Sequence, residues 1–341
     1  MSIHPFILSD CEPPCLEAKL YALLVANPTK SHHFIAQTEQ RQHAFNNHVS
    51  PHNKNVYSWA RSLWKPPYQG EAVSVNIEGN LTAQNLYTLS FVDGCSNKQY
   101  NLENWFNRHE SGYEDACNAL QVLAAGEQIA PQAVLRAFRL KLLSMLRNPY
   151  NHHHEMVQHI FAAFIPFLPR TSTAFRRLIA QRPTDRIQNI LSSFQFTFNE
   201  YTDWLASLYG ILGEGMYRPS LFERLLQALL CDAHHIYFVL YRYDIEPYYC
   251  FFPDTGFCVR NNENEWRLDF SLAANMILSC YIQKTHWQQL WQHLFNPPPF
   301  AKLTLRIDEN DHHQRLLFNH LCVQQAKQAV FGKSNQLAAF F

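Results

Sequence analysis

The chain has 341 residues, which fits two domains or one large one and suffices for a substantial core. Apolar residues make up 47%, charged residues only 16%, and the formal net charge is zero, which excludes a disordered or strongly charged chain. A surface so poor in charge favours contact with a protein partner or a second copy of the chain.

The nine cysteines are odd in number and irregularly spaced, and several lie inside apolar runs. This pattern indicates buried, reduced thiols in a cytoplasmic protein and not a disulfide framework. No secretion signal opens the chain and no apolar run is long enough to span a bilayer, so we expect no membrane partner.

Residues 1–130 are expected to form a mixed α/β part. A short helix is predicted near residue 20, followed by a polar, histidine-rich loop over 31–70. Alternating or β-branched runs then predict three strands, and an acidic helix is expected to run from about residue 100 until Gly126 ends it. The strands are expected at 55–59, 71–79 and 85–92.

Residues 131–233 are expected to be helical and basic, and residues 234–341 to be β-rich with a closing helix. The first central helix should begin at Pro131 and stop before Pro149. Further helices are predicted at 152–163, 171–181, 184–194, 198–213 and 219–232. The last part is predicted to contain strands at 236–243, 248–252, 257–260, 265–270 and 302–307, with helices at 285–295 and 311–330.

This order predicts the α+β class, with a small β-rich N-terminal part, a central helical bundle and a C-terminal β-sheet with flanking helices. The three parts are expected either as separate regions or as one compact unit. The chain contains no phosphate-binding glycine loop, no nucleophile elbow and no Rossmann fingerprint, which excludes the enzymes that depend on those motifs.

The neutral net charge conceals two oppositely charged blocks. Residues 71–130 carry eight carboxylates against two cations, and residues 131–190 carry nine cations, eight of them arginine, against two carboxylates. On one interpretation the basic helices pack against the acidic block. On the other they bind phosphate or nucleic acid. The residues predicted for that contact are Arg136, Arg139, Arg147, Arg176 and Arg177.

The stretch from residue 31 to 55 holds five histidines, and three functional interpretations compete for it. A structural zinc site would use Cys11 and Cys15 with His32 and His33, although no second well-spaced pair completes it. A His-Asn-His nuclease would need a β-hairpin that the stretch lacks. The third interpretation makes His33 part of a site completed from elsewhere in the chain. The other three histidines, His43, His48 and His52, are expected to be exposed in a polar loop.

Two later segments contribute candidates to that site. Arg147, in LRNP, ends an apolar helix, where it can contact an anion near His33 or complement the helix dipole. Asp254, in FPDTGF, follows a strand in a Pro-Asp-x-Gly turn, where it can hold a metal or a base or serve only the turn. In DENDHH, at 308–313, we expect an aspartate to cap the last helix.

Taken in order, the segments HHFIAQ, LRNP, FPDTGF and RLDFSL, with Glu114 in an acidic helix, resemble a broad uncharacterised bacterial family. Its members carry a His-aromatic-Ile-Pro-Gln motif, a helix ending in Arg-x-Pro and a late Ser-Asp-x-Pro or Ser-Asp-x-Gly turn. Here Ala36 replaces the usual proline and Pro253 the usual serine. The resemblance implies a setting in phage defence or mobile-element biology, and it selects His33, Gln37, Glu114, Arg147 and Asp254.

Two functions follow as expectations. The first is a metal-dependent nuclease or phosphodiesterase effector with His33, Glu114, Arg147 and Asp254 as catalytic residues and a divalent metal on His33 and Asp254. The second is a non-enzymatic subunit of a defence or mobile-element complex that binds a protein or nucleic acid.

Overall fold

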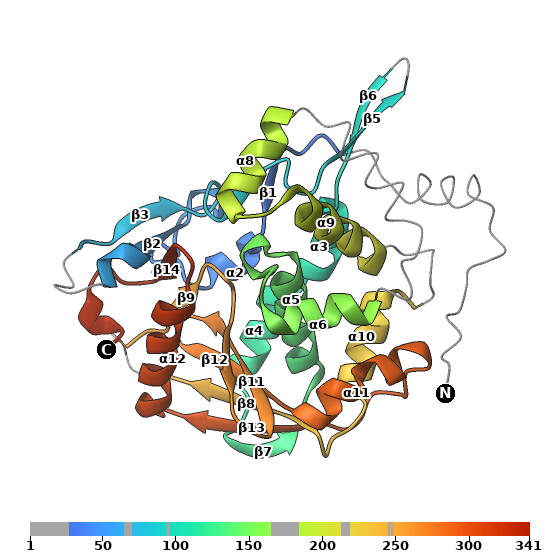
Figure 1. The fold of residues 1–341 in the computed structure, drawn as a ribbon. Coiled ribbons are helices and arrows are strands. Elements are labelled where there is room, and N and C mark those ends of the chain that lie inside the picture. The colour runs from blue at the N-terminus through green and yellow to red at the C-terminus, as the bar shows by residue number, and fades with distance from the viewer. Residues whose placement is uncertain are drawn as a thin grey trace.

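The computed structural model describes residues 27–64, 70–93, 96–164, 184–212, 219–244, 246 and 248–341. Along the chain, the N-terminal and C-terminal parts contain the strands, and the part between them is mainly helical (Figure 1). The expected α+β class is therefore confirmed. The helices expected near residue 20 and at 171–181 lie outside the described residues, as do Arg176 and Arg177.

A six-stranded sheet in the order β10-β11-β12-β8-β13-β7 forms the base of the molecule (Figure 1). Its neighbours are antiparallel except for the parallel pair β8 and β13. The N-terminal part supplies its edge strand β7, and the C-terminal part supplies the rest. The strands are β7 (Gly126–Ile129), β8 (Ile236–Arg242), β10 (Cys258–Asn261), β11 (Glu265–Ala273), β12 (Met276–Gln283) and β13 (Thr304–Glu309).

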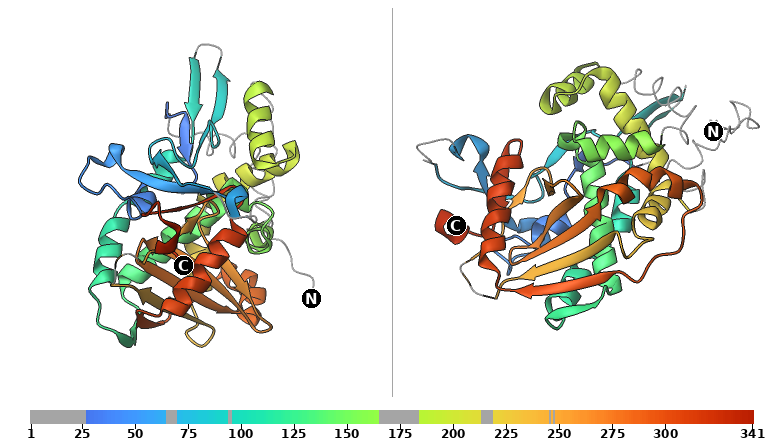
Figure 2. Two further views of the ribbon diagram at one scale, coloured as in Figure 1. Left: turned by 90° about the vertical axis from the view of Figure 1, so that its left-hand side faces the viewer. Right: turned by 60° about the horizontal axis from the view of Figure 1, so that its bottom comes forward.

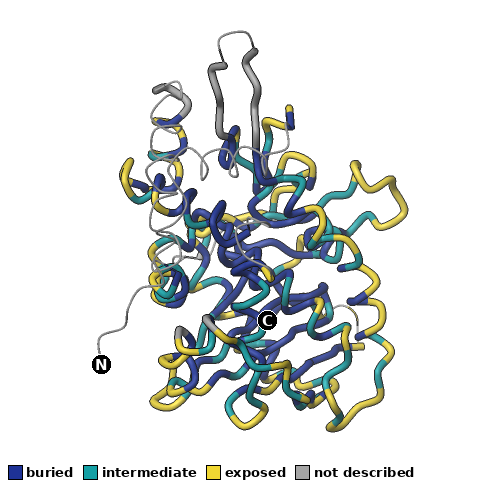
Figure 3. The backbone as a smooth tube through the Cα atoms, turned by 90° about the vertical axis from the view of Figure 1, so that its right-hand side faces the viewer, coloured by how far each residue is buried: buried dark blue, intermediate teal, exposed yellow. Residues whose placement is uncertain are grey.

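Both faces of this sheet are covered, because successive side chains of a strand point to opposite sides. In β8, Phe238 and Leu240 belong to the main core beside helix α5 (Gln132–Arg147), whereas Val239 and Tyr241 belong to a second core beside helix α12 (His312–Gln325). Figure 2 shows α5 and α12 on opposite sides of the sheet. Figure 3 shows that the buried backbone is concentrated in these strands and in the helices behind them.

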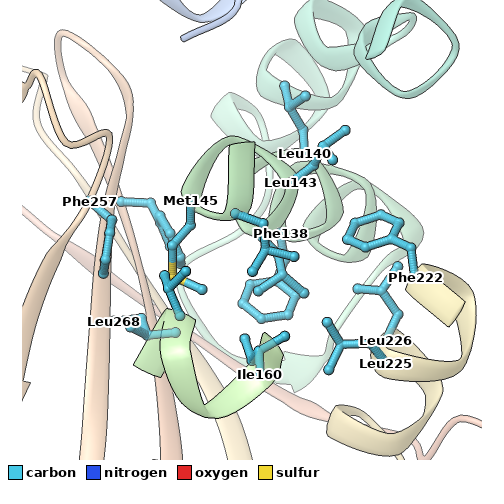
Figure 4. Packing of buried hydrophobic residues seen from close by; sticks show 14 of the residues in the cluster. Phe138, Leu140, Leu143, Met145, Ile160, Phe222, Leu225, Leu226, Phe257 and Leu268 are labelled. Carbon is cyan, nitrogen blue, oxygen red and sulfur yellow. The ribbon is translucent and has the colours of Figure 1, made fainter. Parts of the chain in front are cut away.

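The main core is built around α5. The ring of Phe138 packs edge-on against Phe238 at 5.3 Å and lies 6.0 Å from Phe270. Figure 4 shows Phe138 facing Ile160 of α6 (Glu155–Phe164) and Leu225 of α10 (Leu221–Leu229). The cluster contains residues from all three expected parts, so they share one core.

A second, four-stranded sheet joins the two ends of the described chain. It has the order β3-β2-β14-β9, so strand β14 near the C-terminus lies between β2 and β9. Two further pairs are β1 with β4 and the hairpin β5–β6, which projects from the body in Figure 1. The strands are β1 (Ser31–His33), β2 (Asn55–Ala60), β3 (Val73–Asn76), β4 (Thr82–Gln84), β5 (Leu89–Asp93), β6 (Ser96–Tyr100), β9 (Phe252–Pro253) and β14 (Ala329–Gly332).

The helices agree with expectation in the middle of the chain but not before it. The helices predicted at 184–194 and 198–213 are present as α8 (Thr184–Phe194) and α9 (Phe198–Leu212), and α11 (Lys284–Phe295) follows β12. The single helix predicted to end at Gly126 was wrong. It is divided into α3 (Glu103–Glu110) and α4 (Tyr113–Gln121), and Gly126 begins β7 instead.

The break between α3 and α4 occurs at Gly112, whose φ is +79°. Residues with a side chain rarely adopt this conformation, so the glycine ends one helix and starts the next. None of the helices in the described ranges is long and apolar enough to cross a membrane.

Replacing Gly112 with alanine should lower the free energy of unfolding by about 1–2 kcal/mol, because a Cβ is strained at a positive φ. The matched control is Gly79→Ala. No atom lies within 4 Å of a Cβ there, and its φ is not in the left-handed region, so we expect little change. Urea denaturation measures both, and equal effects of the two substitutions would contradict this account.

Candidate functional site

The histidine-rich segment docks on α5 and does not form an open loop. His32 is buried in β1, where its Nδ1 accepts the backbone N–H of Tyr87 at 2.9 Å and its Nε2 lies 3.0 Å from the carbonyl oxygen of Thr29. Both ring nitrogens are therefore engaged with the backbone, which leaves neither for the structural zinc of the first interpretation. Cys11 and Cys15 lie outside the described residues.

His33 is half-buried and held at the edge of the same segment. Its Nε2 lies 3.2 Å from the carbonyl oxygen of Ile77 and 3.3 Å from Nε2 of Gln37. Burial lowers the pKa of His33, and the positive charge of Arg147 lowers it further. The imidazole is therefore favoured in its neutral form near pH 7, and His33 and Arg147 are close enough to interact electrostatically.

Arg147 is fully buried at the end of α5. Its Nη1 donates to Oε1 of Glu110 at 2.6 Å, and its guanidinium lies over the ring of Phe106 at 4.5 Å. Nε and Nη2 are buried without a hydrogen-bond partner among the described residues. A buried guanidinium paired with Glu110 cannot reach a nucleic-acid backbone, so the expected phosphate contact of Arg147 is not seen.

Glu103 lies in the same electrostatic environment. Burial raises its pKa to about 7, although the charge of Arg147 acts in the opposite direction. The neighbouring His109 has its pKa lowered to about 4, first by burial and then by Arg139, Arg108 and Arg147. At neutral pH the imidazole of His109 is therefore favoured in its neutral form.

A second buried polar group joins helix α2 (Gln37–Arg41) to α5. The carboxylate of Glu39 accepts from Nζ of Lys141 at 2.5 Å and also from the hydroxyl of Ser144. All three side chains are buried. Because this triad is closed to solvent, it stabilises the contact between α2 and α5 and offers no access to a substrate.

The expectation for His43 was wrong, because its side chain is only 1% exposed. Its Nε2 lies 3.4 Å from the hydroxyl of Ser271, and its ring packs on Phe252 at 4.5 Å. Burial and then the charge of Lys141 lower its pKa. His48 and His52 are exposed as expected.

Asp254 is buried and engaged with the backbone of the segment that leads into β14. Its Oδ1 accepts the N–H of Lys327 at 2.8 Å, and its Oδ2 accepts those of Gln328 and Ala329 at 2.5 and 3.0 Å. Burial raises the pKa of the carboxyl, and these donors act against that shift. Three donors occupy the carboxylate, so its contacts fit an anchor of the chain better than a metal ligand.

Three of the segments that carry the family resemblance meet at this turn. Nδ2 of Asn148 donates to the carbonyl oxygen of Asp254 at 2.7 Å, and Nδ2 of Asn151 donates to that of Thr255 at 2.9 Å. Gly256 has a φ of +81°, and a Cβ there would lie 3.6 Å from Cδ1 of Ile35. HHFIAQ, LRNP and FPDTGF are therefore neighbours in space, linked through asparagines and an isoleucine.

Glu114 is exposed in the first turn of α4, away from these contacts. Among the described residues, no group of three potential metal ligands includes His33 or Asp254. Thus His33 lies close enough to Arg147 for the positive charge of Arg147 to affect its pKa. The structure does not, however, bring His33, Glu114 and Asp254 together with Arg147 around one metal site.

A basic hollow of about 500 Å³ lies between α5, α10 and the segment before β13. Among its lining residues are three cations, Arg136, Arg139 and Lys302, and one carboxylate, Glu223, which gives the lining a net charge of +2. Glu223 forms an ion pair with Arg139. A larger hollow of about 700 Å³ beside Asp254 has no cation in its lining, so the basic hollow is the better anion site.

Sequence reasoning selected Arg136 and Arg139 but missed Lys302 and Phe300. Both lie in NPPPFAKL, where a run of prolines keeps the chain extended and exposed. An aromatic residue and a cation that follow a proline run, such as Phe300 and Lys302, are a sequence pattern from which an exposed contact surface could have been predicted.

Asp254→Asn should lower the free energy of unfolding by about 2–4 kcal/mol, because an amide nitrogen would face a backbone donor inside the protein. The matched control is Asp244→Asn, an exposed aspartate for which we expect little change. Urea denaturation and metal analysis are run on the same preparations. A variant of unchanged stability that lost a bound metal would restore Asp254 as a ligand.

Glu103→Gln should stabilise the protein more at pH 8 than at pH 5, by a difference of about 1–3 kcal/mol. The folded-state pKa of about 7 lies above the ordinary glutamate value of 4.5, so the folded state binds this proton more tightly. The wild type therefore loses stability as pH rises through that window, and glutamine removes the loss.

Denaturation midpoints at several pH values measure this difference. Glu114→Gln is the control, an exposed carboxylate on the neighbouring helix for which burial offers no such gain. A Glu103→Gln effect that does not vary with pH would argue against a buried, protonatable Glu103.

The chain matches no protein-family model, no curated protein and no solved structure. The family suggested by its short motifs therefore stays a prediction, together with the defence setting that the resemblance implies.

Proposed function

We propose that the protein is a non-enzymatic nucleic-acid-binding protein whose basic hollow contacts the phosphates of a single strand. The observation that carries the proposal is the joint presence in this hollow of three cations and of exposed apolar side chains. Single-strand binding proteins combine these two features, because cations follow the backbone while the bases stack on apolar rings.

The charges are suited to phosphate. Arg136 and Lys302 are exposed, and neither forms an ion pair with another described residue. Arg139 is oriented by Glu223, and its Nε is buried without a partner in the described chain. Two unpaired cations next to an oriented guanidinium favour an anion with several oxygen atoms.

The apolar part of the lining is suited to a base. Phe300 is 48% exposed and Ile129 is 64% exposed, and both belong to the hollow. An exposed aromatic ring beside arginines offers a stacking surface that every base can use. A volume of about 500 Å³ is in the range of small-ligand pockets and fits a nucleotide unit better than a duplex.

The metal-dependent nuclease expected from the sequence has less support. The carboxylate of Asp254 is occupied by backbone donors, and Glu114 is exposed on another helix. A role in phage defence or mobile-element biology rests on the family resemblance alone, and it remains part of the proposal as the setting in which a bound strand would matter.

The test is binding of a fluorescently labelled 12-nucleotide single strand, followed by anisotropy at several salt concentrations. Arg136→Glu with Lys302→Glu should weaken binding by at least about tenfold and reduce the salt slope by about 1.4, because two phosphate contacts are lost. Phe300→Ala should weaken binding at least about fivefold through lost stacking.

The matched control is Arg61→Glu, which reverses an exposed arginine in the short 3₁₀ turn Arg61–Trp64. It should leave binding near the wild-type level. The proposal is wrong if the wild type does not bind the strand, or if the hollow variants bind as well as Arg61→Glu. Cleavage of the strand with added Mg²⁺ or Mn²⁺ would favour the nuclease instead.

A further inference from the structure

Two segments that are distant in the sequence bring two imidazoles and a carboxylate together. His152 and His153 follow the short 3₁₀ helix η3 (Pro149–Asn151), and Glu200 lies in the first turn of α9. One ligand atom from each of the three residues lies within 4.8 Å of the other two. In the described part of the chain, no other group of three potential metal ligands is so close.

His152 is oriented as a metal ligand would be. Its Nδ1 lies 2.7 Å from the carbonyl oxygen of Pro149, which places the ring proton on Nδ1 and the lone pair on Nε2. Nε2 is buried and has no hydrogen-bond partner among the described residues. The buried His32, in contrast, has both of its ring nitrogens hydrogen-bonded.

This orphaned nitrogen requires an explanation, because a buried acceptor without a partner destabilises the folded state. A cation bound at Nε2 would satisfy the only unpaired atom of this side chain.

Glu200 is held in place by the start of its own helix. Its Oε2 accepts the N–H of Thr197 at 2.7 Å, and its N–H donates to Oγ1 of Thr197 at 3.2 Å, which is a capping box. Its Oε1 lies 3.8 Å from Nε2 of His153. One carboxylate oxygen is thus fixed by the cap, while the other faces the histidines.

The ring of Phe196 forms an apolar floor under the cluster, with its centre 3.8 Å from that of His152. It packs in turn on Trp204 at 5.4 Å. Such a floor limits the access of water and strengthens polar contacts above it. The charge of Lys327 acts on His152 and opposes a cation, whereas the charge of Glu200 favours one.

We propose that His152, His153 and Glu200 form a site for a divalent transition metal, for which zinc is the best fit. Two imidazoles and one carboxylate are the ligand set of many zinc sites, and three protein ligands leave a fourth position for water. Ligand atoms in a tetrahedral zinc site lie about 3.3 Å apart. Here the ligand atoms lie within 4.8 Å of one another, and the side chains of His153 and Glu200 are 53% and 40% exposed.

This site is separate from the basic hollow, and it does not depend on the proposed nucleic-acid binding. The competing explanation is an ion pair between protonated His153 and Glu200 without any metal. That explanation accounts for the pair at 3.8 Å but leaves Nε2 of His152 without a partner.

The experiment is a zinc titration of the full chain after treatment with a chelator, with calorimetry for affinity and elemental analysis for stoichiometry. The wild type should bind one zinc ion per chain. His153→Ala and Glu200→Gln should each weaken that binding more than about tenfold, since each removes a ligand while the cap on Thr197 can persist in Glu200→Gln. Cobalt in place of zinc should give the intense visible bands of a tetrahedral site, and both variants should lose them.

The matched controls are Glu155→Gln and His48→Ala, an exposed carboxylate near the cluster and an exposed histidine far from it in sequence. Both should bind zinc as the wild type does. The site is rejected if the wild type binds no zinc. It is equally rejected if both variants retain wild-type affinity, which would place the metal elsewhere. Circular dichroism of each variant ensures that lost binding does not report unfolding.

Discussion

The buried ion pair between Glu39 and Lys141 determines where the segment that contains α2 lies, and much of the fold depends on that placement. Both side chains are less than 5% exposed, and Ser144 donates to the second carboxylate oxygen. Leaving either charge unpaired in the core would cost about 3–5 kcal/mol. Helix α2 must therefore dock on α5, which in turn holds His33 within the field of Arg147.

The same constraint explains why conspicuous polar residues serve as anchors. Asn148 can donate to the backbone at Asp254 only because α5 ends beside that turn, and the carboxylate of Asp254 then organises the entry into β14. Strand β14 pairs with β2, so the contacts of Asp254 help to hold the C-terminal part of the chain against the part that contains β2. The segments that resemble a family are thus joined by structural contacts, whatever reaction or partner the family has.

Sequence periodicity predicted the elements that have strong local signals. The prediction that prolines bound α5 at both ends was correct. The prediction that an aspartate caps α12 was also correct, because Asp311 accepts the N–H of Gln314 at 2.9 Å. Strand β12 was missed because both of its faces are buried, so MILSCYIQ lacks the alternation that marks a half-exposed strand. The break at Gly112 was missed because one glycine within a helical pattern is compatible with a continuous helix.

The candidate site was harder to predict, because its geometry depends on contacts between distant residues. The donors to Asp254 lie more than 70 residues away, in a segment with no motif. Glu200 was overlooked, although the Thr-x-x-Glu capping box at Thr197 marks a carboxylate fixed at a helix start. Local patterns identify which groups are available, and only the packed chain determines which of them remain unpaired.

The arginines of α5 fit both interpretations of the basic block, because one packs against the acidic block and another remains exposed for an anion. Arg136 and Arg147 are separated by about three helical turns, so they lie on the same side of α5. At the C-terminal end α3 covers this side, and Glu110 neutralises Arg147. Near the N-terminal end of α5, the chain between α3 and α4 passes Arg136 at Gly112. This glycine has no side chain that could cover Arg136. The acidic block therefore neutralises one end of the helix, while the other end stays exposed beside the basic hollow.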